Sequence, residues 1–357
     1  MNRGSREDGY IVLQGLTKHF GSVVAVDRVD LAIAQGEFFA LLGPSGCGKT
    51  TTLRLIAGLE RPTAGRIFIG GRDVTDLVPR ERDVAMVFQD YALYPHMTLL
   101  ENIGYPLKVR GVSRKELVAR VREVAEHLKI EDLLDRRPSQ VSGGQQQRAA
   151  VARALVHEPK VFLFDEPLSN LDAKLRLEAR AFLKHLQREV GVTTVYVTHD
   201  QAEAMAMADR IGVMFAGKIA QVGSPLDVYR EPATVEVAAF LGNPPMNLIP
   251  GRLEGGEFVG PGFRIPLPGA PSVGEAFLGI RPEHLRLADH GELGAIPGRL
   301  YAVQPLGPEV LVTAQVGEAT VSVRLFTEEL PRLGDEVWLV VDSARVHLFD
   351  ADGKRLR

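Results

Sequence analysis

Residues 43–51, which read Gly-Pro-Ser-Gly-Cys-Gly-Lys-Thr-Thr, carry the residue types that phosphate binding requires. They fit the pattern Gly-x-x-x-x-Gly-Lys-[Ser/Thr] of a P-loop. The glycines allow a tight turn whose backbone N–H groups converge on phosphate oxygens, and the helix that follows adds the positive end of its dipole. The residues that we expect to contact the ligand are Gly43, Pro44, Ser45, Gly46, Cys47, Gly48, Lys49, Thr50 and Thr51.

Two side chains of this loop have separate predicted roles. Lys49 brings a full positive charge to the phosphates, and Thr50 offers a hydroxyl to Mg²⁺. Cys47 is interpreted as a small spacer, since it is the single cysteine of the chain. The alternative is a glycine-rich loop that only caps a helix. A dinucleotide-binding fingerprint is excluded, because Thr51 stands where a third glycine is needed.

Acidic and amide side chains follow two apolar runs that are typical of buried strands. Asp165 and Glu166 follow residues 161–164, and Gln89 follows residues 84–88. A carboxylate at the end of a strand can hold Mg²⁺ through water, and its neighbour can orient or deprotonate an attacking water. We therefore expect Asp165 and Gln89 to serve the metal and Glu166 to be catalytic. Without the P-loop, the acidic pair would be no more than a solvated strand end.

A histidine and a second glycine-rich helix start complete the set. His199 follows the strand-like residues 193–198, where it could contact a γ-phosphate; a structural histidine is the alternative. A second anion site is predicted where a helix over residues 145–156 begins, from its Ser142, Gly143, Gly144 and Gln145. If these two phosphate-binding helix ends cannot meet within one chain, two chains must share each nucleotide.

The elements that must position these side chains alternate along the first part of the chain. A strand over residues 38–42 precedes the P-loop, and a helix over residues 51–59 follows it. Two amphipathic helices are predicted over residues 113–128, with a capping box of Ser113 and Glu116, and over residues 172–190. This alternation predicts an α/β fold with a largely parallel sheet.

The second part of the chain has a different composition. Ten prolines precede Asn243 and twelve follow it, so we place a domain boundary there, between residues 1–242 and residues 243–357. Strand-like runs at 277–280, 310–315, 319–325 and 336–341 alternate with Gly and Pro turns. They predict a small antiparallel β-barrel.

Composition limits the class of protein. The chain has 357 residues, 45% of them hydrophobic, and a net charge of −3. Without a long Lys/Arg block, nothing in the charge indicates nucleic acid. No apolar run approaches the ~20 residues that span a bilayer, and residues 1–10 are polar, unlike a secretion signal. We therefore expect a soluble protein in the cytoplasm.

Taken together, these motifs resemble the ATP-binding subunits of bacterial ABC importers, and closely the subgroup that serves sugars, including maltose and glycerol-3-phosphate. The resemblance covers nearly the whole chain. It is carried by the P-loop, the Q-loop at Gln89, the signature at residues 141–145, the Walker B strand through Glu166, the D-loop at residues 169–172 and the H-loop at His199. Residues 243–247 and 279–285 resemble the segments that enter and occupy the C-terminal barrel of this subgroup, an OB-like (TOBE) regulatory domain.

This resemblance implies a head-to-tail dimer, in which the P-loop of one copy and residues 142–145 of the other enclose each ATP with Mg²⁺. Glu166 is implied as the general base, His199 as a γ-phosphate contact, and Phe20 as the aromatic residue against adenine. A helical subdomain is implied at about residues 90–157, with residues 91–97 receiving a short helix from the membrane subunits.

The implied partners are a second copy, two integral-membrane permease subunits, indirectly a solute-binding protein, and a regulator at the C-terminal domain. The implied place is the cytoplasmic face of the cell membrane.

Sugar is the favoured cargo, and importers of polyamines, iron or sulfate are the alternative. A soluble ABC-type ATPase of DNA repair or translation is more remote, because the chain has neither a coiled-coil insertion nor a second cassette. A regulator that does not hydrolyse ATP is disfavoured by the presence of both Asp165 and Glu166.

Overall fold

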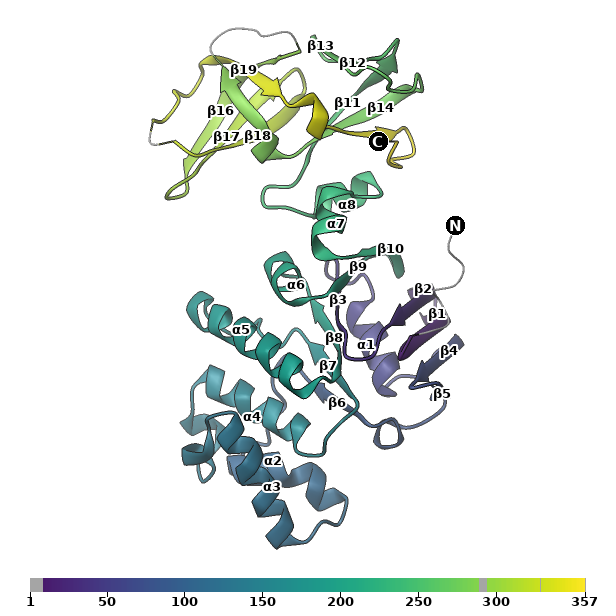
Figure 1. Ribbon diagram of the computed structural model, residues 1–357, viewed down its shortest axis with the longest axis vertical. Coiled ribbons are helices and arrows are strands. Elements are labelled where there is room, and N and C mark those ends of the chain that lie inside the picture. The colour runs from purple at the N-terminus through teal and green to yellow at the C-terminus, as the bar shows by residue number, and fades with distance from the viewer. Residues whose placement is uncertain (1–8, 289–293, 328, 357) are drawn as a thin grey trace. The chain divides into compact units, whose positions relative to one another are not determined.

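The computed structural model describes residues 9–288, 294–327 and 329–356. The first eight residues of the polar N-terminal segment therefore lie outside the described residues. The chain folds into two compact units, residues 1–226 and residues 227–357, which are described separately (Figure 1). Residues 227–242 pack with the second unit. The domain boundary at residue 243 and the limits of the helical subdomain stay predictions.

A six-stranded sheet is the centre of the first unit. Its order is β10-β9-β3-β8-β7-β6, and its strands are β3 (Phe38–Leu42), β6 (Val84–Val87), β7 (Val161–Asp165), β8 (Thr193–Thr198), β9 (Arg210–Phe215) and β10 (Lys218–Gly223). All neighbouring pairs are parallel except β9 with β10. Every residue of β3, β7 and β8 is buried, which is why these strands read as continuous apolar runs rather than as alternating ones.

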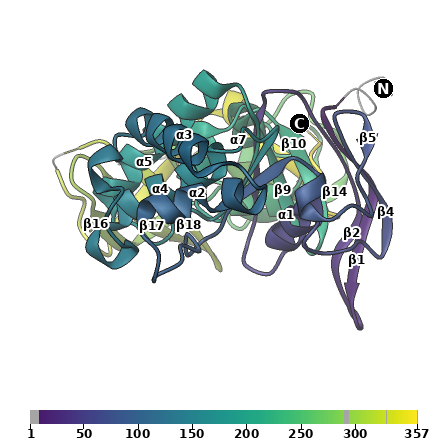
Figure 2. The ribbon, with the colours of Figure 1, turned by 90° about the horizontal axis from the view of Figure 1, so that it is seen from below.

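A second, antiparallel sheet has the order β2-β1-β4-β5 and lies apart from helices α2 to α4 (Figure 2). Its strands are β1 (Ile11–Phe20), β2 (Val23–Ile33), β4 (Ala64–Ile69) and β5 (Arg72–Asp73). Helix α1 (Lys49–Ala57) shares one hydrophobic core with both sheets, since Leu53, Leu55 and Ile56 are fully buried in it. The start of α1 is thereby fixed at the end of β3.

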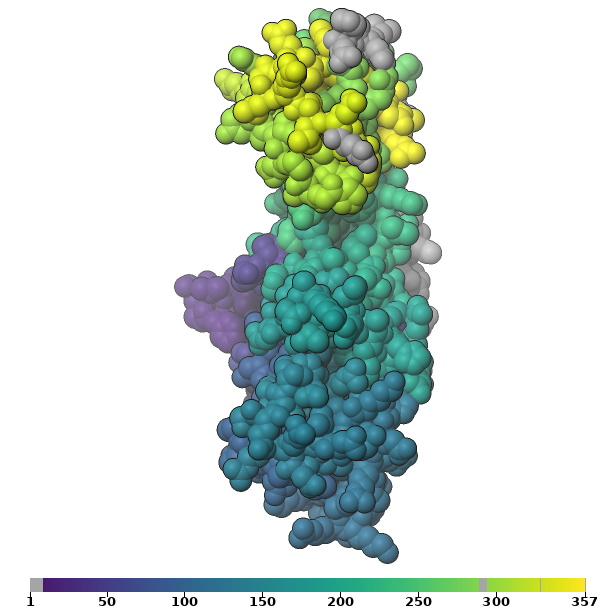
Figure 3. Space-filling view, turned by 90° about the vertical axis from the view of Figure 1, so that its left-hand side faces the viewer, coloured from purple at the N-terminus to yellow at the C-terminus, as the bar shows by residue number. Residues whose placement is uncertain are grey.

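The remaining helices of the first unit are α2 (Leu99–Val109), α3 (Arg114–His127), α4 (Gly143–Leu155), α5 (Ala173–Val190) and α6 (Gln201–Met207). Helices α2 to α4 contact one another and belong to a contiguous lobe (Figure 3). Only half of the predicted capping box of α3 forms. The Ser113 hydroxyl accepts from the Glu116 N–H, but the Glu116 carboxylate contacts Arg120 at 2.7 Å instead.

The second unit begins within a short helix, α7 (Pro225–Arg230), which is followed by another short helix, α8 (Val235–Phe240). The rest of the unit is an all-β domain. The strands are β11 (Asn247–Glu254), β12 (Glu257–Gly260), β13 (Phe263–Pro266), β14 (Gly274–Ile280), β15 (Leu285–Ala288), β16 (Ile296–Pro305), β17 (Val310–Val316), β18 (Ala319–Leu325), β19 (Glu336–Val341) and β20 (His347–Asp350). They make two antiparallel five-stranded sheets, β13-β12-β11-β14-β20 and β15-β19-β16-β17-β18, which share one hydrophobic core.

Two buried polar side chains hold the second unit together. Asn247 on β11 pairs with the backbone of Ser322 on β18, donating from Nδ2 at 2.8 Å and accepting at Oδ1 at 2.7 Å, so it joins the two sheets. The Arg281 guanidinium lies 3.9 Å from the centre of the Tyr229 ring and donates to the carbonyl oxygens of Tyr229 and Leu241. Arg281 thus fastens the α7–α8 segment to the sheets.

The fold agrees with the predicted class, an α/β P-loop domain followed by a small antiparallel β domain. Helix α1 begins at Lys49, two residues before the predicted start, and α4 begins at Gly143, also two residues early. Across the described ranges, no helix combines the length and the apolarity that would let it cross a membrane.

Candidate functional site

The predicted site residues follow four strands that are neighbours in the central sheet. Strands β3, β8, β7 and β6 are parallel and adjacent, so their carboxyl ends lie on the same edge. The P-loop follows β3, His199 follows β8, Glu166 follows β7 and Gln89 follows β6. Ligands of open α/β sheets bind outside this edge. The parallel topology therefore gathers residues that are more than 100 positions apart in the sequence.

Lys49, the first residue of α1, is folded back over its own loop. Its side-chain Nζ donates to the carbonyl oxygens of Gly43 at 2.8 Å and of Pro44 at 2.9 Å. Lys49 is only 5% exposed, and Cys47 Sγ lies 3.8 Å from the same nitrogen. Burial raises the pKa of the Cys47 thiol, which agrees with the interpretation of Cys47 as an inert spacer.

Two glycines of the loop have no space for a side chain. A Cβ on Gly43 would lie 2.2 Å from the carbonyl oxygen of Met214, and one on Gly48 would lie 2.2 Å from that of Ala25. Gly48 also has a φ of +107°, a conformation that L side chains rarely adopt. The loop is therefore closely seated on β2 and β9, with its backbone turned as a phosphate cradle requires.

Thr50 and Asp165 meet at the edge of the sheet. The Thr50 hydroxyl donates to Asp165 Oδ1 at 2.8 Å, so an alcohol oxygen and a carboxylate oxygen lie side by side. These are the ligand types that Mg²⁺ takes in nucleotide sites. Burial raises the pKa of Asp165, and the hydrogen bond from Thr50 partly opposes that shift. The two residues predicted for the metal thus fit an oxygen-ligand site.

Glu166 and His199 form a second pair beside the first. His199 Nδ1 lies 2.8 Å from Glu166 Oε2, which leaves Nε2 as the ring nitrogen that could meet a phosphate. Glu166 has a φ of +46°, and its N–H donates to the Val197 carbonyl of β8 at 3.0 Å. A bulky residue in this conformation is strained, and such strain persists where the surrounding structure imposes it, commonly at functional sites.

The D-loop, residues 169–172, lies directly beside this pair. The Ser169 hydroxyl donates to the Glu166 carbonyl at 2.9 Å, and Asn170 Nδ2 donates to the Gln89 carbonyl at 2.9 Å. Gln89 itself is exposed after β6. The D-loop therefore joins the Q-loop backbone to the Walker B strand, a connection that the sequence did not reveal.

The start of α4 is placed apart from the P-loop contacts just described. Ser142 Oγ accepts from the Gln145 N–H at 3.4 Å, while Gln145 Oε1 accepts from the Ser142 N–H at 2.9 Å, which makes a complete capping box. Gly143 and Gly144 form the first turn between them.

Phe20, at the end of β1, is 47% exposed, and Lys18 Nζ lies 4.7 Å from the centre of its ring. Its role against adenine stays a prediction.

Four charged residues beside the H-loop were missed from the sequence, namely Arg176, Arg180, Asp200 and Glu203. Arg176 Nη1 lies 3.7 Å from Asp200 Oδ2, and Arg176 Nε lies 4.0 Å from Glu203 Oε1. The available signal was a pair of arginines, Arg176 and Arg180, four positions apart at the start of an amphipathic helix. Residues four positions apart lie on one side of a helix, and the mild repulsion between two like charges there favours acidic partners nearby.

A separate hollow of about 270 Å³ lies between β6 and helices α2 and α4. Its wall includes Met86, Phe88, Tyr94, Tyr105 and Arg153. Tyr94 and Tyr105 pack 4.9 Å apart between ring centres, and Arg153 donates to the carbonyl oxygens of residues 91 and 92. Part of the predicted 91–97 segment therefore borders a hollow with aromatic walls.

Comparison with protein families gives three matches. The ABC transporter family model matches residues 26–169, the MalK OB fold domain matches residues 242–285, and the TOBE domain matches residues 278–349. The first match contains the P-loop, Asp165 and Glu166, and the other two lie within the second unit.

Individual relatives are similar over nearly their full length. The trehalose/maltose import ATP-binding protein MalK of Thermococcus litoralis is 50% identical, over 93% of this chain and 95% of the relative. The sn-glycerol-3-phosphate import ATP-binding protein UgpC of Rhodopseudomonas palustris is 48% identical, over 97% and 98%. A solved structure of the ATP-binding cassette MJ0796, a dimer in a post-hydrolysis state bound to ADP and Pi, is 35% identical with a TM-score of 0.54, over 60% of this chain and 98% of that chain.

Proposed function

The chain belongs to the ABC transporter family as an ATP-hydrolysing subunit that uses ATP with Mg²⁺, and from this premise we propose that it powers the import of a carbohydrate or a carbohydrate-like solute. One structural observation supports the assignment of ATP hydrolysis to particular residues. The pairs Thr50–Asp165 and Glu166–His199 stand at adjoining strand ends beside the P-loop. A metal-ligand pair and an acid–base pair are what hydrolysis of a nucleotide requires.

Each residue has a role that follows from its position. The P-loop N–H groups and Lys49 hold the phosphates, which requires Nζ to leave the Gly43 and Pro44 carbonyls. Glu166 accepts a proton from the attacking water, and His199, held through Nδ1, presents its other ring nitrogen toward the γ-phosphate. Thr50, Asp165 and Gln89 would hold Mg²⁺, which when bound neutralises developing charge on the phosphates.

We place the second phosphate-binding helix end, residues 142–145, on the nucleotide of another copy. Its capping box uses the Ser142 hydroxyl and the Gln145 amide within α4, while the N–H groups of the glycines that open the helix remain directed along its axis, as at any helix start. The dimeric state of the MJ0796 relative supports such a pair of copies. ATP would then favour the closed dimer, because only the closed state supplies both halves of each site.

The transport partners follow from the relatives, which are import ATP-binding proteins. We propose two integral-membrane permease subunits, with the chain bound peripherally at the cytoplasmic face and a solute-binding protein acting indirectly. The hollow walled by Tyr94 and Tyr105 is the proposed seat of a short permease helix. Ligand grooves that receive amphipathic helices have such apolar, aromatic walls.

The cargo assignment depends on the relatives as well. Both import relatives handle carbohydrates or a phosphorylated polyol, and both cover this chain almost completely, including the second unit. This similarity favours a carbohydrate over the polyamine, iron or sulfate alternatives, and import over DNA repair or translation. The second unit is proposed as a regulatory domain. Quenching of the single Trp338, on β19, by a candidate metabolite or regulator would report docking there.

The catalytic assignment is tested by replacing Glu166 with Gln in the full-length chain. This substitution removes the proton acceptor but keeps the shape of the side chain, so we expect ATP binding to persist while turnover falls by at least about 10²-fold. The variant should accumulate as an ATP-bound dimer in size-exclusion chromatography with light scattering. Wild-type turnover in Glu166→Gln would refute the role of Glu166, and a chain that releases no phosphate from ATP in any state would refute the proposed function.

A further inference from the structure

The arginine pair on α5 is aimed at the loop that carries His199. Arg176 Nη1 lies 3.7 Å and Arg180 Nη2 lies 3.2 Å from the same oxygen, Asp200 Oδ2. Asp200 directly follows His199 and caps α6, since its Oδ1 accepts from the N–H groups of Ala202 and Glu203. Both arginines therefore hold the residue next to the proposed phosphate contact.

Arg176 has a further partner that Arg180 lacks among the described residues. Its Nη2 donates to the carbonyl oxygen of Leu171, in the D-loop, at 3.0 Å. Leu171 is buried, and its side chain borders α4, because a Cβ on Gly143 would lie 3.3 Å from Leu171 Cδ2. One guanidinium thus contacts both the H-loop, at Asp200, and the backbone of Leu171 in the D-loop, and the side chain of Leu171 borders the start of α4.

The H-loop end of this connection is held by a network of buried hydrogen bonds. Thr198 Oγ1 donates to the buried carboxylate of Glu203 at 2.8 Å and accepts from the Asp200 N–H at 2.9 Å. The Tyr196 hydroxyl donates to the same Glu203 oxygen at 2.8 Å. Buried, mutually satisfied networks of this kind fix one arrangement of the groups that they join. A displacement of Asp200 is therefore passed to His199 rather than absorbed.

Arg176 also borders the reacting groups without touching them. It lines a small cavity of about 80 Å³ together with Glu166, Ser169 and His199. The Arg176 Nε is buried and has no hydrogen-bond partner within the described part of the chain, although Glu203 Oε1 lies 4.0 Å from it. A guanidinium suits this place because its planar fork offers several donors in fixed directions, whereas an ammonium acts as a point charge.

We propose that Arg176 is a positioning residue. By contacting both the D-loop and the H-loop, it fixes their relative position and so preserves the hydrogen bond between His199 and Glu166. The proposal rests on the proposed ATPase function. Within one chain, it also connects the start of α4, which serves the nucleotide of the other copy, with His199, which serves its own. Arg176 acts through the backbone of Leu171 and the carboxylate of Asp200, and not by contact with the substrate.

The first test separates turnover from binding. In Arg176→Gln we expect kcat to fall on the order of 10²-fold, the loss associated with a misplacement of about 1 Å in a catalytic group. The Kd of ATP, measured by calorimetry with Glu166→Gln added to prevent hydrolysis, should change less than threefold, since Arg176 does not reach the P-loop. An unchanged kcat, or a loss confined to the Kd, would overturn the proposal.

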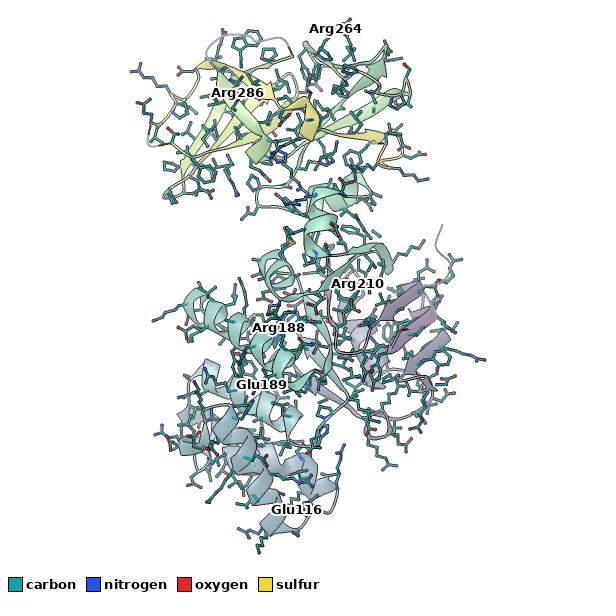
Figure 4. All side chains as sticks on the ribbon, viewed as in Figure 1. Glu116, Arg188, Glu189, Arg210, Arg264 and Arg286 are labelled. Atoms are coloured by element: carbon teal, nitrogen blue, oxygen red, sulfur yellow. The ribbon has the colours of Figure 1, made fainter. Side chains whose placement is uncertain are left out.

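Two other arginines of α5 provide matched controls. Arg180→Gln removes a contact to Asp200 but leaves Leu171 held, so its loss of kcat should be at least several-fold smaller than that of Arg176→Gln. Arg188, exposed near the end of the same helix and labelled in Figure 4, should tolerate Gln without change. An equal loss in Arg180→Gln and Arg176→Gln would show that the D-loop contact is not needed.

A double-mutant cycle then asks whether Arg176 acts through His199. In a His199→Ala background, followed by single-turnover phosphate release over hours, Arg176→Gln should cost no more than about twofold, because residues that act as a unit are not additive. A second loss of the full size would indicate general structural damage and would overturn the proposal. Wild-type and Glu166→Gln turnover, measured alongside, report separately on the proposed function.

Discussion

At the scale of a single residue, Asp165 shows that a side chain suited to binding a metal can reduce the stability of the folded protein. Its carboxyl is buried, and burial raises its pKa because a charged group is poorly solvated there. Burial therefore makes ionisation of Asp165 less favourable in the folded than in the unfolded chain, although a metal ligand must be ionised. Stability from this group is greatest below the ordinary pKa of an aspartate and is lost as the pH rises through the raised value.

The upward shift of the Asp165 pKa leads to a prediction for the stability of Asp165→Asn. The amide imitates the neutral acid and can still accept from Thr50, so without Mg²⁺ the variant should unfold about 2–4 °C higher than the wild type at pH 7. The difference should shrink as the pH falls through the ordinary pKa of an aspartate, because the carboxyl then becomes protonated in both the folded and the unfolded chain. Calorimetry at the two pH values measures it, with exposed Asp352→Asn as the control. A lower Tm for Asp165→Asn at pH 7 would contradict the burial argument, whatever happens to turnover.

The identities of the site residues could be predicted from the sequence, but several of their contacts could not. Motif spacing gave Thr50, Asp165, Glu166 and His199, because each follows a recognisable strand or loop. That Thr50 bonds Asp165, or that His199 Nδ1 meets Glu166, depends on rotamers set by neighbours across the sheet. Arg176 was missed because its partners lie on two loops that no local pattern connects.

At the scale of elements, buried strands were predicted best. The bounds of β3, β8, β18 and β19 match the predicted residues, since each strand consists mainly of apolar or β-branched residues. The starts of α1 and α4 were placed two residues late: α4 opens with Gly143 and Gly144, which have poor helix propensity, and α1 opens with Lys49 and Thr50 directly after its N-cap Gly48. Tertiary contacts of the loop, and not propensity, set these starts.

The capping boxes of α2 and α4 offer a comparison between stability and function. Thr98 caps α2 and Ser142 caps α4 with the same reciprocal pattern, bonding the N–H of Glu101 and of Gln145. Replacing either cap residue with Ala should cost about 1 kcal/mol and lower the Tm by about 2–4 °C. Only Ser142→Ala should also reduce ATPase activity, several-fold or more, because only α4 is proposed to face a nucleotide.

The measurements are thermal unfolding and steady-state phosphate release on the two variants. Thr98→Ala serves as the control for the loss of a cap by itself. If both variants keep wild-type turnover, the assignment of residues 142–145 to the nucleotide of another copy is wrong. If both lose it equally, the effect of Ser142→Ala reflects stability alone.

At the scale of the whole molecule, the chain divides into two compact units after residue 226, whereas the change in composition places a domain boundary at residue 243, which stays a prediction. The α7–α8 segment belongs to the second unit because of Arg281, whose guanidinium is fully buried against Tyr229 and Leu241. Proline counts report where turns become frequent, and they cannot report a side chain that fastens a helix from 40 or more residues away.

The second unit contains a buried histidine that should make it sensitive to acid. Burial, together with the nearby Arg355 and Arg281, lowers the pKa of His347 to about 4, so the fold requires the neutral imidazole, and the Glu231 carboxylate opposes this only in part. Because the folded pKa lies below the ordinary 6.5, the stability from this group is complete above about pH 6.5 and is lost as the pH falls toward 4. Between pH 7 and pH 5 the second unit should lose on the order of 1–2 kcal/mol of stability from His347, which lowers its Tm by about 5 °C.

Differential scanning calorimetry of the full chain measures this shift of the Tm. His347→Leu, which cannot titrate, should remove most of the shift, and the control His185→Gln, at an exposed position, should leave it unchanged. An identical pH dependence in His347→Leu and the wild type would mean that other groups cause the acid sensitivity.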